Sequence, residues 1–140
     1  METVLKKIDI NFTPIEEINK MLETSKIKFI DSEFPPDESS IIGYSDKNLI
    51  DDTVNHWRRP GDIYGDYTLI DRMNHNNLVK GKLADHSFFS VVTALAFLNP
   101  ALLERLFFKQ TQINRFGIYR LRLCKNGEWQ TVTVDDLLPC

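Results

Sequence analysis

The segment from His86 to Leu98 constrains the fold most, because it is apolar nearly all the way round a helix. A helix of this composition is expected to be buried inside the protein rather than to lie on its surface. Asp85 precedes it and can cap its first amides. Asn99-Pro100 is expected to end it and to start a second helix from Ala101 to about Phe108.

The N-terminal part of the chain also predicts a helix. Thr13-Pro14-Ile15-Glu16 has the pattern of a helix start with a capping box, in which Thr13 and Glu16 satisfy free amides. Ile15, Ile18 and Leu22 then fall on one face. We expect an amphipathic helix that ends near Thr24.

The C-terminal part changes to the alternating pattern of strands. Asn126-Gly127 is a strong turn signal, so the residues from Gly117 to Val134 are predicted to form a β-hairpin. Between the helices, residues 27–42 are expected to be an extended crossing segment, and residues 46–80 irregular loops with short strands or turns. Helices first and strands last, without βαβ alternation, predict an α+β fold.

Composition excludes several classes of protein. The chain has 140 residues, which suits one core, and its net charge of -3 argues against a nucleic-acid surface. No stretch approaches the roughly 20 apolar residues of a membrane span, and the N-terminus lacks a secretory signal. The two cysteines are too few for a disulfide scaffold, so we expect a cytoplasmic protein.

The segment Gly81–Phe89 resembles the motif that carries the catalytic cysteine of calpains, the calcium-dependent cysteine endopeptidases. Calpains typically have Gln-Gly-Gln-Leu-Gly-Asp-Cys-Trp-Phe-Leu there. The glycine, leucine, aspartate and phenylalanine agree at Gly81, Leu83, Asp85 and Phe88. The resemblance places His86 at the nucleophile position, Ser87 at the tryptophan and Lys80 at the oxyanion glutamine.

Three further blocks follow the family order. The segment Phe29–Pro36, with Ser39-Ser40-Ile41 after it, is similar to Phe-x-Asp-x-x-Phe-Pro-Pro…Ser-Leu. The segment Trp57–Ile63 resembles Trp-x-Arg-Pro-x-Glu-Ile. The segment from Gly127 to Pro139 is close to Gly-x-Trp-x-x-Val-x-Val-Asp-Asp-Leu-Leu-Pro.

The resemblance implies a papain-like fold, of which residues 1–140 would form a partial catalytic domain. It would contain only the first lobe: N-terminal helix, loop-rich segment, buried central helix, second helix and C-terminal hairpin. The family's catalytic histidine and asparagine lie on a second lobe, and residues 1–140 are not expected to contain that lobe. In calpains an acidic residue about nine positions before the cysteine helps to bind calcium; here it is Asn77. A neutral ligand weakens a site for a hard cation, so no calcium or other cofactor is expected.

The favoured interpretation is therefore a calpain-like pseudoprotease that binds protein without cleaving it. Imidazole is a poor substitute for a thiolate, and losing a nucleophile typically costs on the order of 10⁶ in rate. A flexible lysine does not reproduce the neutral amide donor either. Half of a two-lobed fold should expose apolar surface, so we expect a protein partner, either a larger calpain or a second copy. The alternative is a divergent or truncated calcium-dependent endopeptidase, including one whose nucleophile is Cys124 or Cys140.

Simpler interpretations compete for several residues. Ser87 beside His86 could be a nucleophile with its base, but neighbours on a helix point about 100° apart. Lys80 could bind an anion at a helix N-terminus, although a solvated lysine is commoner. Asp135-Asp136 could bind a metal, but a turn that caps local amides is the commoner role. One possible set of zinc ligands consists of His56, His75, Cys124 and Cys140. The spacing of these residues fits no known zinc-binding pattern. Trp57 and Trp129 are expected to be core or hairpin aromatics.

Overall fold

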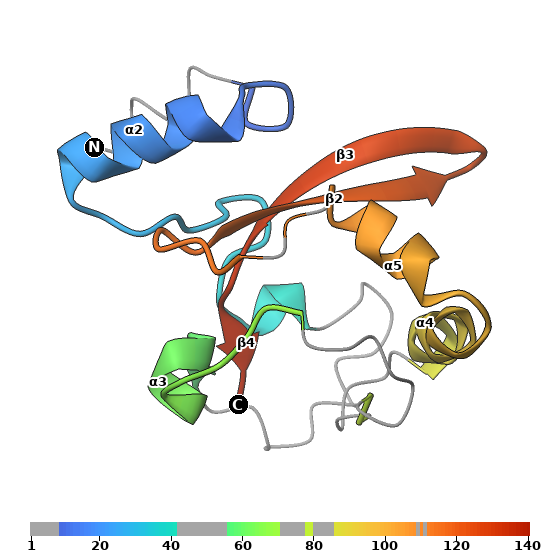
Figure 1. Ribbon diagram of the computed structural model, residues 1–140. Coiled ribbons are helices and arrows are strands. Elements are labelled where there is room, and N and C mark those ends of the chain that lie inside the picture. Colours follow the sequence, from blue (N-terminus) through green and yellow to red (C-terminus); the bar gives the residue numbers. More distant parts are fainter. Residues whose placement is uncertain (1–8, 42–55, 71–77, 80–85, 109, 111) are drawn as a thin grey trace.

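The computed structural model describes residues 9–41, 56–70, 78–79, 86–108, 110 and 112–140. Its elements follow one another in this order: α2 (Ile15–Ser25), the short 3-10 helix η1 (Glu38–Ser40), β1 (Trp57–Arg58), α3 (Pro60–Tyr64), α4 (His86–Leu98), α5 (Pro100–Leu106), β2 (Ile118–Lys125), β3 (Glu128–Asp135) and β4 (Leu138–Pro139). The mixture of helices and small antiparallel sheets confirms the α+β class (Figure 1).

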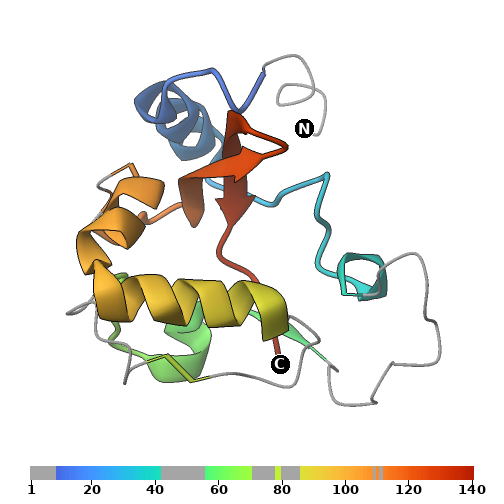
Figure 2. The same cartoon turned by 90° about the vertical axis from the view of Figure 1, so that its right-hand side faces the viewer.

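The hairpin of β2 and β3 separates the helices. α2 lies on one side of it, and α5 and α4 lie on the other (Figures 1 and 2). The strands pair in antiparallel register from Ile118 opposite Asp135 to Lys125 opposite Glu128. Asn126 and Gly127 both have positive φ, at 53° and 84°, as a tight hairpin turn requires. The predicted hairpin and its turn are confirmed.

The main core lies where α2 meets the start of β2. Ile18 and Leu22 are buried together with Phe29 and Ile118, and Ile10, Ile15 and Phe116 pack against them. Full burial of each large aliphatic side chain stabilises the fold by about 1.5–3 kcal/mol. The predicted apolar face of this helix is thus confirmed.

The predicted capping box at Thr13 is wrong. The helix begins at Ile15 with Pro14 as its N-cap residue and without a side-chain cap. The Thr13 hydroxyl instead donates to the carbonyl of Asp9 at 2.8 Å, so it closes the preceding turn. That tight turn places Thr13 outside the helix, because proline has taken the capping position.

Arg120 connects the segment before α2 to the hairpin through hydrogen bonds. Its guanidinium Nη2 donates to the carbonyls of Ile10 at 2.6 Å and Thr13 at 2.7 Å. Burial lowers the pKa of this arginine from its usual value. Bonds to two carbonyls compensate for part of the lost solvation of the charge.

Between α2 and β1, residues 27–31 have no regular secondary structure, as predicted, but the 3-10 helix η1 interrupts the segment further on. Phe29 is buried and its amide donates to the carbonyl of Phe116 at 2.8 Å. The loop region after it contains a feature that the sequence did not predict, the short helix α3. Pro60 stands at its first position, where proline's fixed φ suits a helix and its missing amide costs nothing.

β1 and β4 form a second, very short antiparallel pair. Trp57 lies opposite Pro139, and Arg58 lies opposite Leu138. The pairing continues by one residue, because His56 and Cys140 exchange both backbone hydrogen bonds, at 3.1 and 2.8 Å. This pair brings the end of the described chain beside the start of α3.

The prediction that α4 is buried is wrong for this chain, although its bounds are as predicted. Ala96 is the buried residue of α4, while Phe88 is 64% exposed, Val91 59% and Leu98 75%. An apolar helix is buried only where other elements cover it, and the element that α4 contacts most is α5, at one end (Figure 2). Phe89, Val92, Thr93 and Leu95 are partly buried, and the side chains of α4 other than these and Ala96 are exposed. No helix in the described ranges is long and apolar enough to cross a membrane.

Candidate functional site

The first turn of α4 carries the residue that the sequence placed at the nucleophile position. His86 is the first residue of the helix and is exposed. Its carbonyl accepts a hydrogen bond from the hydroxyl of Ser90 at 2.7 Å, so the turn is closed by a side chain one turn further on. An exposed imidazole therefore stands at the helix N-terminus, and it supplies no sulfur.

Two other predicted site residues, Lys80 and Asn77, lie outside the described residues, as does Asp85. Ser87 is exposed beside His86. The two side chains form no hydrogen bond with each other among the described contacts, which fits their divergent directions on a helix. The structure therefore gives no support to a serine nucleophile activated by its neighbour.

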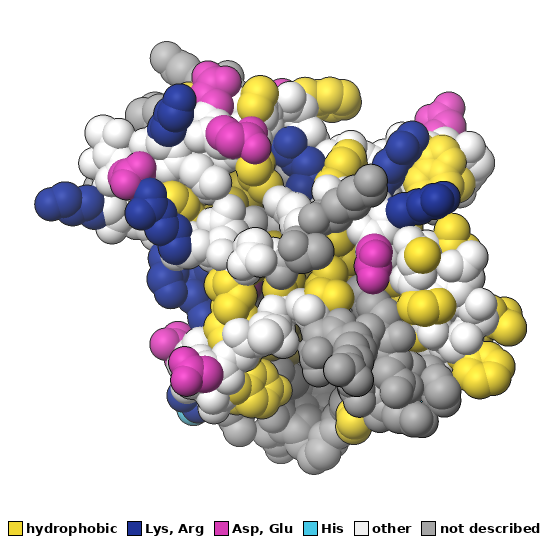
Figure 3. Space-filling view, in the orientation of Figure 1, with side chains coloured by type: hydrophobic (Ala, Val, Ile, Leu, Met, Phe, Trp, Pro, Cys, Tyr) yellow, Lys and Arg dark blue, Asp and Glu magenta, His cyan; other side chains and the backbone are white. Residues whose placement is uncertain are grey.

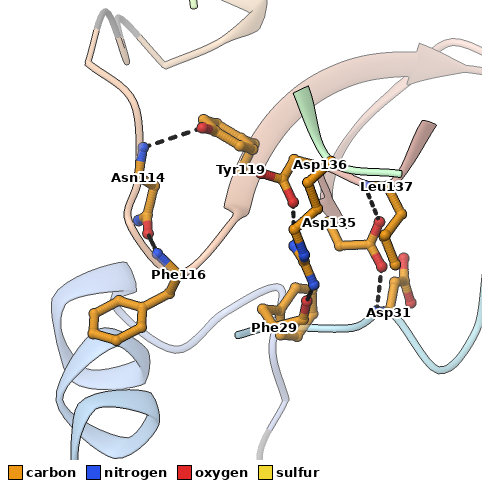
Figure 4. Close-up of polar contacts among 9 residues, drawn as sticks. Phe29, Asp31, Asn114, Phe116, Tyr119, Asp135, Asp136 and Leu137 are labelled. Carbon is orange, nitrogen blue, oxygen red and sulfur yellow. Dashed lines mark hydrogen bonds and ion pairs between the residues drawn. The ribbon is translucent and has the colours of Figure 1, made fainter. Parts of the chain in front are cut away.

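A second polar centre joins three segments that are distant in the sequence. Arg59 forms an ion pair with Asp136, and both side chains are about nine-tenths buried. The same guanidinium donates through Nη2 to the carbonyl of Phe29 at 2.8 Å (Figure 4). A buried arginine needs such partners for its charge and its donors. This arginine anchor holds the crossing segment, the start of α3 and the end of β3 together.

Asp135 adds a second connection beside the anchor. Its Oδ1 accepts from the amide of Leu137 at 2.9 Å, and its Oδ2 accepts from the amide of Asp31 at 2.8 Å (Figure 4). The predicted capping role is confirmed for this residue. The contacts do not support the metal-pair interpretation, because Asp136 pairs with Arg59 and both oxygens of Asp135 accept from amides.

Tyr119 borders the same centre. Its hydroxyl accepts from the amide of Asn114 at 3.1 Å, and the Asn114 side chain accepts from the amide of Phe116 at 2.8 Å (Figure 4). Burial raises the pKa of Tyr119 to about 12, with smaller contributions from nearby Tyr67 and Asp136. The phenol therefore stays neutral over the physiological range and acts as a fixed hydrogen-bond acceptor.

The two tryptophans have the roles that the sequence predicted. Trp57 is half-buried on β1 and meets Phe34 edge to face, with ring centroids 6.4 Å apart. Trp129 is 58% exposed on β3, and the Arg122 guanidinium lies 5.3 Å above its ring. Such stacking is a modest surface stabilisation.

The histidines and cysteines of the possible zinc set do not assemble as a group. Cys124 lies on β2 near the hairpin turn, while Cys140 lies opposite His56 beside β4. His75 is outside the described residues. Across the ranges that the structure describes, no three histidine, cysteine or acidic side chains are grouped to hold a metal. Both cysteines are free and exposed.

Residues 29–140 match the model of the calpain family cysteine protease. This range contains the arginine anchor, α4 and the hairpin. The chain therefore belongs to the calpain family of cysteine proteases.

Particular relatives are similar over most of this chain. It is 32% identical over 123 residues to the calpain-type cysteine protease ADL1 of Oryza sativa subsp. japonica. The aligned region covers 80% of this chain and 5% of that protein. It is 30% identical over 131 residues to Calpain-5 of Caenorhabditis elegans, covering 89% of this chain and 19% of that protein. The chain thus spans only a small part of the length of these relatives.

The arginine anchor is the feature that sequence reasoning missed. Arg59 and Asp136 each fall in a block that resembles the family, but no spacing rule connects residues so far apart. The available signal was indirect. Charged residues inside apolar blocks, one basic and one acidic, suggest a buried pair only when both blocks are already known to meet.

Proposed function

We propose that this chain is a calpain-like pseudoprotease, which binds protein and does not cleave it. The observation that carries the proposal is His86 as the first residue of α4. In a papain-like enzyme the positive end of the central helix favours a thiolate, which is the reactive form of cysteine. A histidine at this position supplies no sulfur nucleophile, and we infer that the replacement of cysteine is what removes cleavage.

The rest of the catalytic set supports the same proposal. The resemblance puts Lys80 where a neutral amide should donate to the oxyanion, and it assigns the catalytic histidine and asparagine to a second lobe. We infer that residues 1–140 correspond to the first lobe of a papain-like core. With Asn77 at the calcium-ligand position, binding and folding are expected to be independent of calcium.

A protein-binding role is supported by the exposed apolar side of α4. Phe88, Val91 and Leu98 are each more than half exposed, and apolar side chains protrude over α4 and α5 in the space-filling view (Figure 3). Contiguous apolar surface on a soluble domain commonly marks a protein interface. We propose that a larger calpain, or a second copy of this chain, covers this side of α4 in the cytoplasm.

Association can be measured directly. Size-exclusion chromatography with light scattering at micromolar concentration is expected to give a dimer, or a complex with an added calpain protease core. A compact monomer that does not bind the added protease core would refute the binding role.

The second candidate is a cysteine endopeptidase, and it is supported by family membership and by relatives named as cysteine proteases. In this chain the thiol would have to come from Cys124 or Cys140. Cys124 lies near the end of a strand and Cys140 follows a two-residue strand, so neither occupies the start of a helix. Neither therefore stands where a papain-like enzyme holds its nucleophile.

A labelling experiment separates the two functions. The chain is treated with a thiol-directed peptide warhead, with and without calcium, and casein cleavage is followed in parallel. Cys124→Ser and Cys140→Ser serve as matched controls for thiols outside a helix start. The pseudoprotease is expected to show no cleavage and no calcium-stimulated labelling. Calcium-stimulated labelling that one of the serine variants abolishes would establish the enzyme instead.

A further inference from the structure

The edge formed by β1 and β4 places a thiol opposite an imidazole. His56 and Cys140 exchange both backbone hydrogen bonds, which makes them a directly opposed, hydrogen-bonded pair in an antiparallel ladder. Side chains of such a pair emerge on the same face of the sheet, with Cβ atoms about 4.5–5.5 Å apart. The backbone therefore fixes the juxtaposition of these two side chains.

We propose that His56 and Cys140 form a two-residue binding site for a thiophilic cation of the Zn²⁺ type. Zinc binds imidazole nitrogen at about 2.0–2.1 Å and thiolate sulfur at about 2.3 Å, so one ion can bridge side chains with this Cβ separation. Solvent supplies the other positions of the tetrahedron. The site is independent of α4 and goes beyond the proposed pseudoprotease role.

Both ligands are accessible to an incoming ion. His56 and Cys140 are exposed. The thiol makes one weak bond, donating to the carbonyl of Leu138 at 3.5 Å. Losing this bond on deprotonation costs little compared with forming a metal–thiolate bond.

The neighbouring cation does not oppose the ion directly. Arg58 lies two positions after His56 and so emerges on the same face. Its guanidinium Nη2 donates to the carbonyl of Asp62, so the charged group is held against α3. One thiolate offsets part of the ion's charge, so the bound site carries one net positive charge in place of two.

The experiment titrates the full 140-residue chain, kept reduced by a phosphine, with Cd²⁺ as a spectroscopic probe and then with Zn²⁺ in competition. Binding is read from the ultraviolet absorption of the metal–thiolate bond. His56→Ala and Cys140→Ser are each expected to weaken binding by about tenfold or more, because each removes half of the protein ligands. Cys124→Ser and His86→Ala, which alter the same residue types elsewhere on the surface, are expected to leave the affinity unchanged.

Two results would overturn the proposal. Equal binding by the wild type and His56→Ala would mean an adventitious ion on a single thiol. Loss of binding after a Gly-Ser extension is added behind Cys140 would mean that a terminal carboxylate, rather than the imidazole, is the second ligand. Backbone amide spectra of each variant check that the β1–β4 pair still forms, so that lost binding reports the ligands.

Discussion

Arg59 and Asp136 form a buried ion pair across a separation of 77 positions in the chain. The guanidinium also reaches the carbonyl of Phe29, so one side chain joins three blocks of the sequence. These are blocks through which the chain resembles calpains. The contacts of Arg59 hold the hairpin and the crossing segment in place.

Removing one partner of this pair should be costly. Asp136→Asn keeps the shape of the side chain but leaves the charge of Arg59 without its counterion in a buried site. We expect the free energy of unfolding to fall by about 3 kcal/mol, measured by urea denaturation. The matched control is Glu23→Gln, which breaks the exposed pair with Arg115. That change should cost less than about 1 kcal/mol, and equal losses in the two variants would contradict the role of the anchor.

Gly117 should be the glycine that tolerates substitution least. Its φ is +67°, and a Cβ there would overlap the Arg59 guanidinium and the Asp136 carboxylate. Gly127 has a similar φ of +84° but open space around it. Alanine at either position strains the backbone, by about 1 kcal/mol, and only Gly117→Ala also displaces the ion pair. Urea denaturation is expected to show a clearly larger loss for Gly117→Ala, and similar losses would mean that backbone strain alone matters.

Tyr119 should make stability fall at alkaline pH. Its pKa is raised to about 12 by burial, whereas the phenol of an unfolded chain titrates near about 10. Above about pH 10 the unfolded chain loses the proton first, so the contribution present at lower pH is lost as the pH rises toward 12. Tyr119→Phe should flatten this dependence in urea denaturation between about pH 10 and 12. It should also cost about 1 kcal/mol at neutral pH, because the Asn114 amide loses its acceptor.

The exposed Tyr64 provides the control for this titration. Its side chain is 68% exposed, so Tyr64→Phe should leave the pH dependence as in the wild type. An unchanged slope in Tyr119→Phe would show that another group causes the alkaline loss.

The sequence predicted those parts of the fold that local patterns determine. The hairpin follows from strand alternation and the Asn126-Gly127 turn, and α2 follows from the spacing of Ile15, Ile18 and Leu22. Both depend on residues within a few positions of one another. The failed capping box at Thr13 is also local, but there a tight turn and a proline competed for the same positions.

The parts that failed depend on contacts between distant segments. Apolar residues all round α4 predict burial, yet burial requires covering elements that an isolated helix pattern cannot supply. The pairing of His56 with Cys140, and of Arg59 with Asp136, follows from how the residues around β1 meet the residues after β3. For the candidate site, the sequence placed His86 correctly at the start of its helix. Lys80 and Asn77 lie outside the described residues and remain predictions.

Restoring a cysteine at the helix start should not restore proteolysis. His86→Cys would place a thiol at the first residue of α4, where labelling by a peptide warhead is expected to increase. Casein cleavage should stay at background, because the proposed first lobe lacks the base and the oxyanion donor. Turnover from this single change would show that the other catalytic partners lie elsewhere in this chain.

The apolar side of α4 should control association. Phe88→Ser removes an aromatic side chain that is 64% exposed, so it costs little folding stability while removing much of the proposed contact surface. We expect the dissociation constant of the self-associated or mixed complex to rise by about tenfold or more in light-scattering dilution series. Phe12→Ser is the matched control, since Phe12 is 82% exposed in the turn before α2, away from α4. Of these two residues, only Phe88 belongs to the proposed interface. If both variants weaken association equally, the association is driven by general surface apolarity rather than by α4.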